Sequence, residues 1–157
     1  MSRKSISIIG IMGLLTILFL AGCAKNESPA LQEAKVQEVT VFKSNSCGCC
    51  GAYVQYMQQK GFTVNVQTVT DITQIKDQFS IPANMESCHT TKIGNYFVEG
   101  HVPIEAIDKL LTEKPDIAGI ALPAMPSGSP GMPGGKTGAW IVYAINHDRT
   151  SYEFMRI

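Results

Sequence analysis

The chain has 157 residues, with thirteen basic and thirteen acidic side chains and a formal net charge of zero at pH 7. That balance, with no cluster of basic residues, argues against a nucleic-acid partner. The length suits one domain with a single core once an N-terminal signal is removed.

The N-terminus reads as a targeting signal. Two basic residues precede an uncharged apolar run over residues 6–20, which ends in Leu20-Ala21-Gly22-Cys23. This pattern predicts a secretory signal peptide over residues 1–22, and the run is short for a membrane-spanning helix. The last four residues resemble the bacterial lipobox, which predicts Cys23 as the lipid-modified first mature residue. An uncleaved anchor, or an ordinary signal with a chance cysteine, is the alternative.

Two or three acyl chains on Cys23, such as palmitate, anchor a protein durably to a lipid membrane. We therefore expect a lipoprotein of the cell envelope that faces the periplasm. No Asp follows Cys23, which favours the outer membrane in a bacterium with two membranes. Residues 23–37 are polar, carry Pro29 and lack clear periodicity, so they are predicted to form a tether ahead of a domain over residues 38–157.

The rest of the chain alternates between strand and helix patterns. The β-branched and aromatic residues, helix caps and turn residues predict strands at 38–43, 63–69, from 90 and at 96–98, with helices at 49–60, 71–79 and 103–113. Residues 119–135 are so rich in Pro and Gly that a loop without helix or central strand is expected. A C-terminal hairpin is expected over 139–145 and 151–157.

Three cysteines crowd the junction of the first strand and first helix, in Cys47-Gly48-Cys49-Cys50. A Cys-x-x-Cys near a βαβ unit is the sequence cue of a thioredoxin-like fold. The order β-α-β-α-β-β-α agrees with it. We therefore predict an α/β, thioredoxin-like fold, with a mixed central sheet and flanking helices. It would carry the Pro/Gly/Met loop and the C-terminal hairpin in addition.

Thiols at a helix start ionise more easily than free cysteine, and a thiolate serves both disulfide exchange and metal binding. In thioredoxin-like proteins a loop with a cis-proline packs against the Cys-x-x-Cys. Here that loop carries Cys88 and His89 without a proline. This difference favours a soft metal site formed by Cys47, Cys49, Cys50 and Cys88. Two structural disulfides, zinc or an iron–sulfur centre are the other possibilities.

Further candidate ligands are His89, His101, Met125 and Met132, because imidazole and thioether both bind copper. His101 could instead make a capping or core hydrogen bond, and the methionines could fill core space. Glu99 could orient a histidine, and His147 is expected to be solvated.

Four motifs stand out in the chain: Lys43-Ser44-x-x-Cys47-Gly48-Cys49-Cys50-Gly51, Ser87-Cys88-His89-Thr90, Val98-Glu99-Gly100-His101-Val102-Pro103 and Pro123-x-Met125-Pro126-x-Gly128-Ser129-Pro130-Gly131-Met132. Together they resemble one family, the CopG-type copper-resistance family, a bacterial domain of unknown function. The resemblance covers roughly residues 38–157. It implies a thioredoxin-like fold, an envelope location and a role in copper resistance.

The resemblance further implies a cluster of several copper(I) ions held by the four cysteines, with interconversion of copper(I) and copper(II). This would make the protein a possible copper oxidoreductase, with an efflux or redox partner in the envelope. A thiol–disulfide oxidoreductase, with Cys47 attacking and Cys50 resolving, is the alternative enzyme. A passive copper chaperone is a third possibility. The region ahead of the domain has no histidine, and no cysteine besides Cys23, so it adds no ligand.

Overall fold

The computed structural model describes residues 27–157 of the chain. The predicted signal peptide and the predicted lipidation site, Cys23, lie outside the described residues. Among residues 27–157 no helix combines the length and apolar character needed to cross a membrane.

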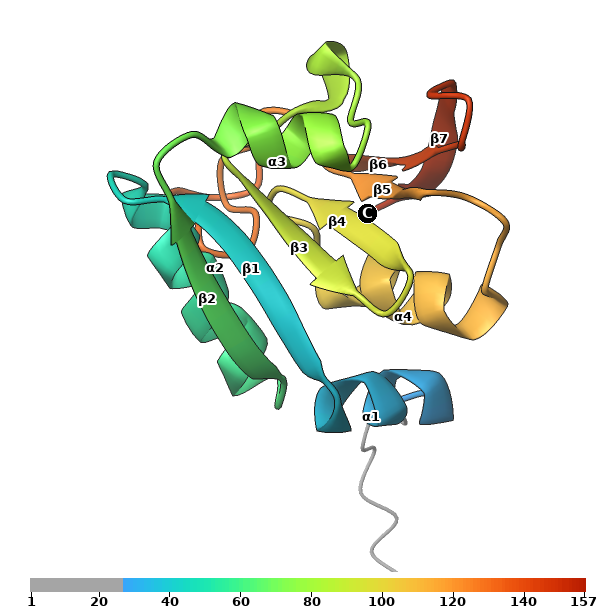
Figure 1. Cartoon of the computed structure of the whole chain (residues 1–157). Helices are drawn as coiled ribbons and strands as arrows, with labels where there is room; N and C mark the ends of the chain where they lie inside the picture. Colours follow the sequence, from blue (N-terminus) through green and yellow to red (C-terminus); the bar gives the residue numbers. More distant parts are fainter. Residues whose placement is uncertain (1–26) are drawn as a thin grey trace, which may run out of the picture.

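A seven-stranded mixed sheet forms the centre of the molecule (Figure 1), in the order β2-β1-β3-β4-β5-β6-β7. Parallel pairing joins β1 to β2 and β4 to β5, whereas the other neighbours are antiparallel. The strands are β1 Glu38–Ser44, β2 Thr63–Val69, β3 His89–Ile93, β4 Tyr96–Glu99, β5 Gly119–Ala121, β6 Ile141–Ile145 and β7 Ser151–Arg156.

The helices cover both faces of this sheet. They are α1 Pro29–Val36, α2 Gly48–Gln59, α3 Ile72–Gln78, the short 3-10 helix η1 Ala83–Met85 and α4 Ile104–Glu113. Buried residues of α1, α2 and α4 share one core cluster with Val98 of β4. The neighbouring Phe97 belongs to a second cluster with Met85 of η1. Because successive strand residues point to opposite faces, these two clusters are the two layers on either side of the sheet.

The sequence β1-α2-β2-α3-β3-β4-α4 confirms the predicted thioredoxin-like order, and β6 and β7 form the predicted C-terminal hairpin. The observed ends of the predicted elements lie within about two residues of expectation, the usual uncertainty of such boundaries. This frame places the start of α2 beside the loop that leads into β3.

The predicted tether is wrong for residues 29–36, which form α1. The Ser28 hydroxyl accepts the backbone N–H of Leu31 at 3.1 Å, and Pro29 occupies the first turn. Both features favour a helix start. Leu31 and Ala34 are buried in the main core. Leu31 and Ala34 are the only buried residues of this eight-residue helix, so the sequence offers no amphipathic pattern of normal length there.

The predicted loop over residues 119–135 is wrong at its first three residues, which form β5 between β4 and β6. Pro and Gly become dense only from Pro123 onward, so their unfavourable effect on strand formation begins there. Gly119 belongs to the strand for a packing reason. A Cβ at this position would lie 2.6 Å from Cγ of Phe97, which is too close for any side chain.

Candidate metal centre

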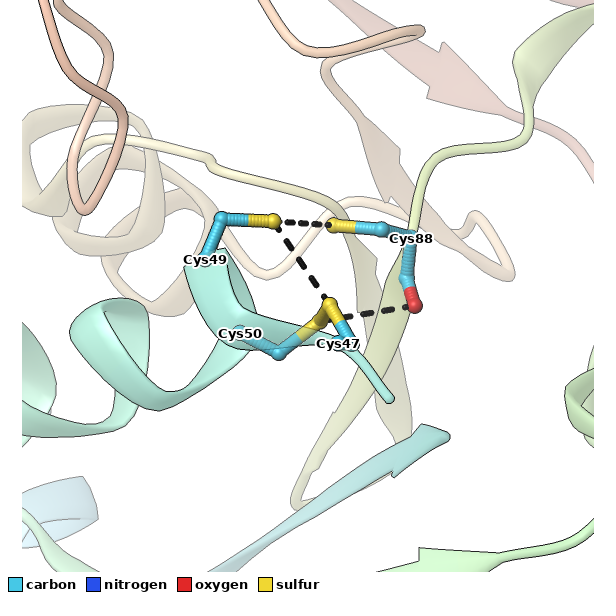
Figure 2. A group of neighbouring side chains, drawn as sticks. All are labelled: Cys47, Cys49, Cys50 and Cys88. Carbon is cyan, nitrogen blue, oxygen red and sulfur yellow. Dashed lines mark hydrogen bonds between the residues drawn. A yellow bond between two sulfur atoms is a disulfide. The ribbon is translucent and has the colours of Figure 1, made fainter. Parts of the chain in front are cut away.

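Four cysteines meet where the first turn of α2 faces the loop before β3 (Figure 2). The Sγ atom of Cys49 lies 3.5 Å from that of Cys47 and 3.7 Å from that of Cys88. The Sγ atom of Cys50 lies 3.6 Å from the carbonyl oxygen of Cys88. The four sulfurs all lie within 4.8 Å of one another, which is close enough for shared metal ions. The fold therefore brings together all four predicted thiolate ligands.

Two of these cysteines are oxidised in the structure. Cys47 and Cys50 form a disulfide across the Cys-x-x-Cys segment, with their Cα atoms 5.4 Å apart. Cys49 and Cys88 are free thiols, so the possible arrangement of two structural disulfides is not formed among these four residues. The centre thus holds a dithiol/disulfide pair beside two thiols.

The start of α2 favours negative charge at these sulfurs. Cys47 is its N-cap, its side chain makes no capping hydrogen bond, and the first turn carries no acidic residue. The unpaired N–H groups and the helix dipole at this end stabilise thiolates.

Two histidines extend the cluster on the side of Cys88. Its Sγ atom lies 3.0 Å from Nε2 of His101 and 3.4 Å from Nδ1 of His89. His101 Nδ1 donates a hydrogen bond of 2.7 Å to the carbonyl oxygen of Pro130. Because a carbonyl only accepts, Nδ1 of His101 carries the proton and Nε2 presents its lone pair to Cys88.

His89 is fully buried, and its Nε2 has no hydrogen-bond partner in the described part of the chain. Its ring packs 4.4 Å from that of Tyr53 and 4.8 Å from that of His101, measured between centroids. A buried polar atom without a partner is costly. Because the other ring nitrogen, Nδ1, faces the Cys88 thiol, His89 fits a ligand or a tuning group of a metal site.

Burial sets the protonation of this centre. It lowers the pKa of His89 well below its usual range, with help from the nearby His101 and Lys76. It also lowers the pKa of His101. Burial and the adjacent Cys49 raise the pKa of Cys88 to about 12. The metal-free centre is therefore neutral at Cys88 and both imidazoles, and the histidines are in the form that binds metal.

Cys88 belongs to two groups of potential ligands. One is the set of four cysteines, and the other is Cys88 with His89 and His101. Thiolates suit copper(I), whereas imidazole also suits copper(II). The site therefore combines soft sulfur donors with imidazole donors, a set that fits a metal centre.

The loop that follows β5 lies over the same end of the sheet. Pro130 binds His101, and a Cβ on Gly131 would lie 2.6 Å from the backbone nitrogen of Tyr53 in α2. Met132 is partly buried directly after this contact, whereas Met125 is 49% exposed. The roles of both methionines as ligands stay predictions.

Glu99 makes no direct hydrogen bond to a histidine among the described residues. Its oxygens accept hydrogen bonds from the Ser87 backbone, the Thr90 hydroxyl and the ammonium group of Lys76. The sequence reasoning missed the burial of Lys76. A signal existed, because Lys76 shares the helical face of Ile72 and Phe79, at spacings of four and three residues. His147 is exposed, as predicted.

A thioredoxin-like fold with a cluster of thiols and imidazoles defines a metal-binding member of that fold class. Two solved structures agree with this class, titled "Copper resistance protein copG", Form 2 and Form 1. Each shares 35% sequence identity with this chain and covers 76% of it. The matches span 97% and 96% of those chains, with TM-scores of 0.71 and 0.70.

The chain therefore belongs to the CopG copper-resistance family, which confirms the resemblance found in its motifs. Residues 85–132 also match the family described as "Protein of unknown function, DUF411". That segment contains Cys88, both cluster histidines and both loop methionines. No curated protein matches the chain.

Proposed function

We propose that this protein is an envelope copper-binding protein of copper resistance that holds several copper(I) ions at Cys47, Cys49, Cys50 and Cys88. One observation carries the proposal: two segments 38 residues apart bring four sulfurs within 4.8 Å of one another. Soft thiolates select copper(I), and sulfurs this close can each bridge more than one ion. The family membership supports copper as the metal.

We further propose that the bound copper changes valence without leaving the protein. Copper(I) would be held mainly by sulfur, and copper(II) would gain His89 and His101. Cys88 can serve both states because it lies in both ligand groups. A protein that only delivers copper needs no such mixed set of donors.

The Cys47–Cys50 disulfide must open before all four sulfurs can bind copper. Two electrons and two protons convert the disulfide into two thiols, and a dithiol reductant that supplies them becomes a disulfide. Each thiol then loses its proton when copper binds. Full loading of the cluster is therefore expected only in reduced protein.

Anaerobic titration of reduced protein with copper(I), against a competing chelator, tests the proposal. The wild-type protein is expected to bind several ions. A variant with all four cysteines changed to serine is expected to lose nearly all of this binding. Equal copper retention by that variant, or no binding by the wild type, would contradict the proposal.

Thiol–disulfide exchange is the second candidate, and the Cys47–Cys50 disulfide favours it. Cys47 is the more exposed partner and Cys50 is fully buried, as expected of attacking and resolving thiols. Metal-free protein would then reduce insulin disulfides. Turnover that persists after Cys49→Ser and Cys88→Ser would favour exchange over copper chemistry, because a dithiol cycle uses neither residue.

A further inference from the structure

A buried carboxylate, Glu99, lies at the end of β4 beside the loop that carries Cys88. The side chain is fully buried. Its Oε1 accepts the backbone N–H of Ser87 at 2.6 Å, and its Oε2 accepts the hydroxyl of Thr90 at 2.6 Å. The ammonium group of Lys76, only 2% exposed, also donates to Oε1.

These contacts hold Ser87 and Thr90, the two ends of the segment that carries the candidate ligands Cys88 and His89. Ser87 precedes Cys88, and Thr90 follows His89. Thr90 also pairs directly with Glu99 across β3 and β4, so the carboxylate lies under the segment by strand register. The Cys88 carbonyl has only the nearby Cys50 sulfur, at 3.6 Å, among the contacts of the described chain. His89 is itself held within β3, where its carbonyl accepts the Gly100 N–H at 2.9 Å and it pairs with Lys43 of β1. Cys88 lies just ahead of this strand, so its position depends more on the residues on either side of it.

Lys76 explains how the Glu99 carboxylate can stay charged while it is fully buried. It reaches the carboxylate from α3, on the sheet face opposite α2, and balances its negative charge. A charge-assisted hydrogen bond is stronger than a neutral one, and a network with every member paired is rigid. The remaining lone pairs of the buried carboxylate accept the Ser87 N–H and the Thr90 hydroxyl, which compensates its desolvation and also ties it to the segment that carries Cys88.

We propose that Glu99 is a positioning residue for Cys88 and His89, fixing the Ser87–Thr90 segment so that this thiol and imidazole meet the thiols of α2. Lys76 supports Glu99 in this role. The consequence for copper rests on the proposed function, whereas the placement of Cys88 is a property of the metal-free protein.

Two double variants separate positioning from stability. Lys76→Met with Glu99→Leu removes both charges and leaves the Ser87 N–H and the Thr90 hydroxyl without an acceptor. Lys76→Met with Glu99→Gln also removes both charges but keeps an amide oxygen for Ser87. Buried ion pairs often tolerate replacement by uncharged residues of similar volume, so both variants are expected to fold. Glu38→Gln is the matched control, because this exposed carboxylate at the start of β1 bonds, among the described residues, only to Asn65 of β2.

The first measurement is the alkylation rate of Cys88 in metal-free protein, followed by peptide mass spectrometry. The Leu variant is expected to react about fivefold faster or more, because the segment opens locally. The second measurement is copper(I) affinity, which is expected to fall about 10- to 100-fold, as for other losses of support behind a ligand. The Gln variant and Glu38→Gln are expected to stay within about threefold of wild type in both.

The proposal is overturned if the Leu and Gln variants behave alike. It is also overturned if the Leu variant loses thermal stability while its Cys88 reactivity and copper affinity match the wild type. If the wild type binds no copper, the proposed function fails, and a faster alkylation of Cys88 in the Leu variant alone still supports the positioning role.

Discussion

At the scale of single residues, His89 differs from the other ligand candidates because one of its ring nitrogens is buried without a partner. His101, in contrast, is tied to Pro130 through Nδ1. We therefore expect hydrogen bonds to constrain the His89 ring less than the His101 ring, and His89 to change its metal coordination more easily.

We expect His89→Ala to impair valence cycling more than copper(I) binding. Copper(I) affinity should stay within about tenfold of wild type, while reoxidation slows by about tenfold or more, because imidazole favours copper(II). Electron paramagnetic resonance through reduction and air reoxidation measures this. His147→Ala is the control, since within residues 27–157 that exposed ring bonds only to Asp116. Copper that stays monovalent in wild-type protein would leave storage or delivery as the function.

Copper binding at Cys88 should release a proton at neutral pH, because burial raises the pKa of this thiol to about 12. For each thiol proton displaced, the apparent copper(I) affinity should rise about tenfold per pH unit between about pH 6 and 8. Competition titrations at three pH values check this slope. A flat profile would show that Cys88 is not a ligand.

The same pKa affects the stability of the metal-free fold. The unfolded chain loses the Cys88 proton near pH 8.5, whereas the folded chain keeps it until about pH 12. The folded state binds more protons in that range, so its free energy of unfolding falls as the pH rises through it. Cys88→Ser should lose this part of the pH dependence in denaturant titrations.

At the scale of elements, α1 acts as part of the domain. Leu31→Ala should lower the free energy of unfolding by about 2–5 kcal/mol, because Leu31 is 2% exposed in the main core. Val36→Ala on the same helix should change it by less than about 0.5 kcal/mol, since Val36 is 85% exposed. Chemical denaturation measures both. Equal effects would restore the tether interpretation.

The loop after β5 depends on Gly131 at its contact with α2. Its φ is 81°, and a Cβ would lie 2.6 Å from the Tyr53 nitrogen. Gly131→Ala should displace the loop that holds His101 through Pro130, and copper(I) affinity should fall about tenfold. Gly135→Ala meets no atom within 4 Å and should leave the affinity unchanged. Comparing the two variants by chelator competition tests the loop's part in the centre.

At the scale of the whole molecule, α1 lies at one end of β1 and the start of α2 at the other (Figure 1). Since α1 begins at Pro29, the stretch between it and the proposed lipidated Cys23 could span at most about 20 Å. A membrane anchor there would hold the metal centre on the far side of the domain, accessible to partners in the envelope.

Cys23→Ser is expected to abolish lipidation and to move the protein from the membrane to the soluble envelope fraction, because durable anchoring needs two or more acyl chains. Cell fractionation and mass spectrometry of the mature N-terminus measure the result. A variant that stays in the membrane fraction would indicate an uncleaved anchor.

The sequence alone determined the order of most elements, because residue patterns of strand, helix and turn are local. Three crowded cysteines at a strand–helix junction, together with Cys88 in the loop before the hairpin, predicted a reactive centre. The sequence did not predict α1 or β5, since α1 buries only Leu31 and Ala34 and β5 is three residues long. Both depend on neighbours far along the chain.

Only the tertiary structure decided how the centre is held. The shared position of Cys88 between thiols and histidines, the tautomer of His101 and the placement of Glu99 and Lys76 all follow from contacts between distant segments. In a sequence, a lysine and a glutamate are expected on the surface, because burying either one alone is costly. Only their pairing in the folded chain compensates that cost. The physical reason is that the residue type decides which metal a side chain can bind. The packing of distant segments around the sheet decides where that side chain lies.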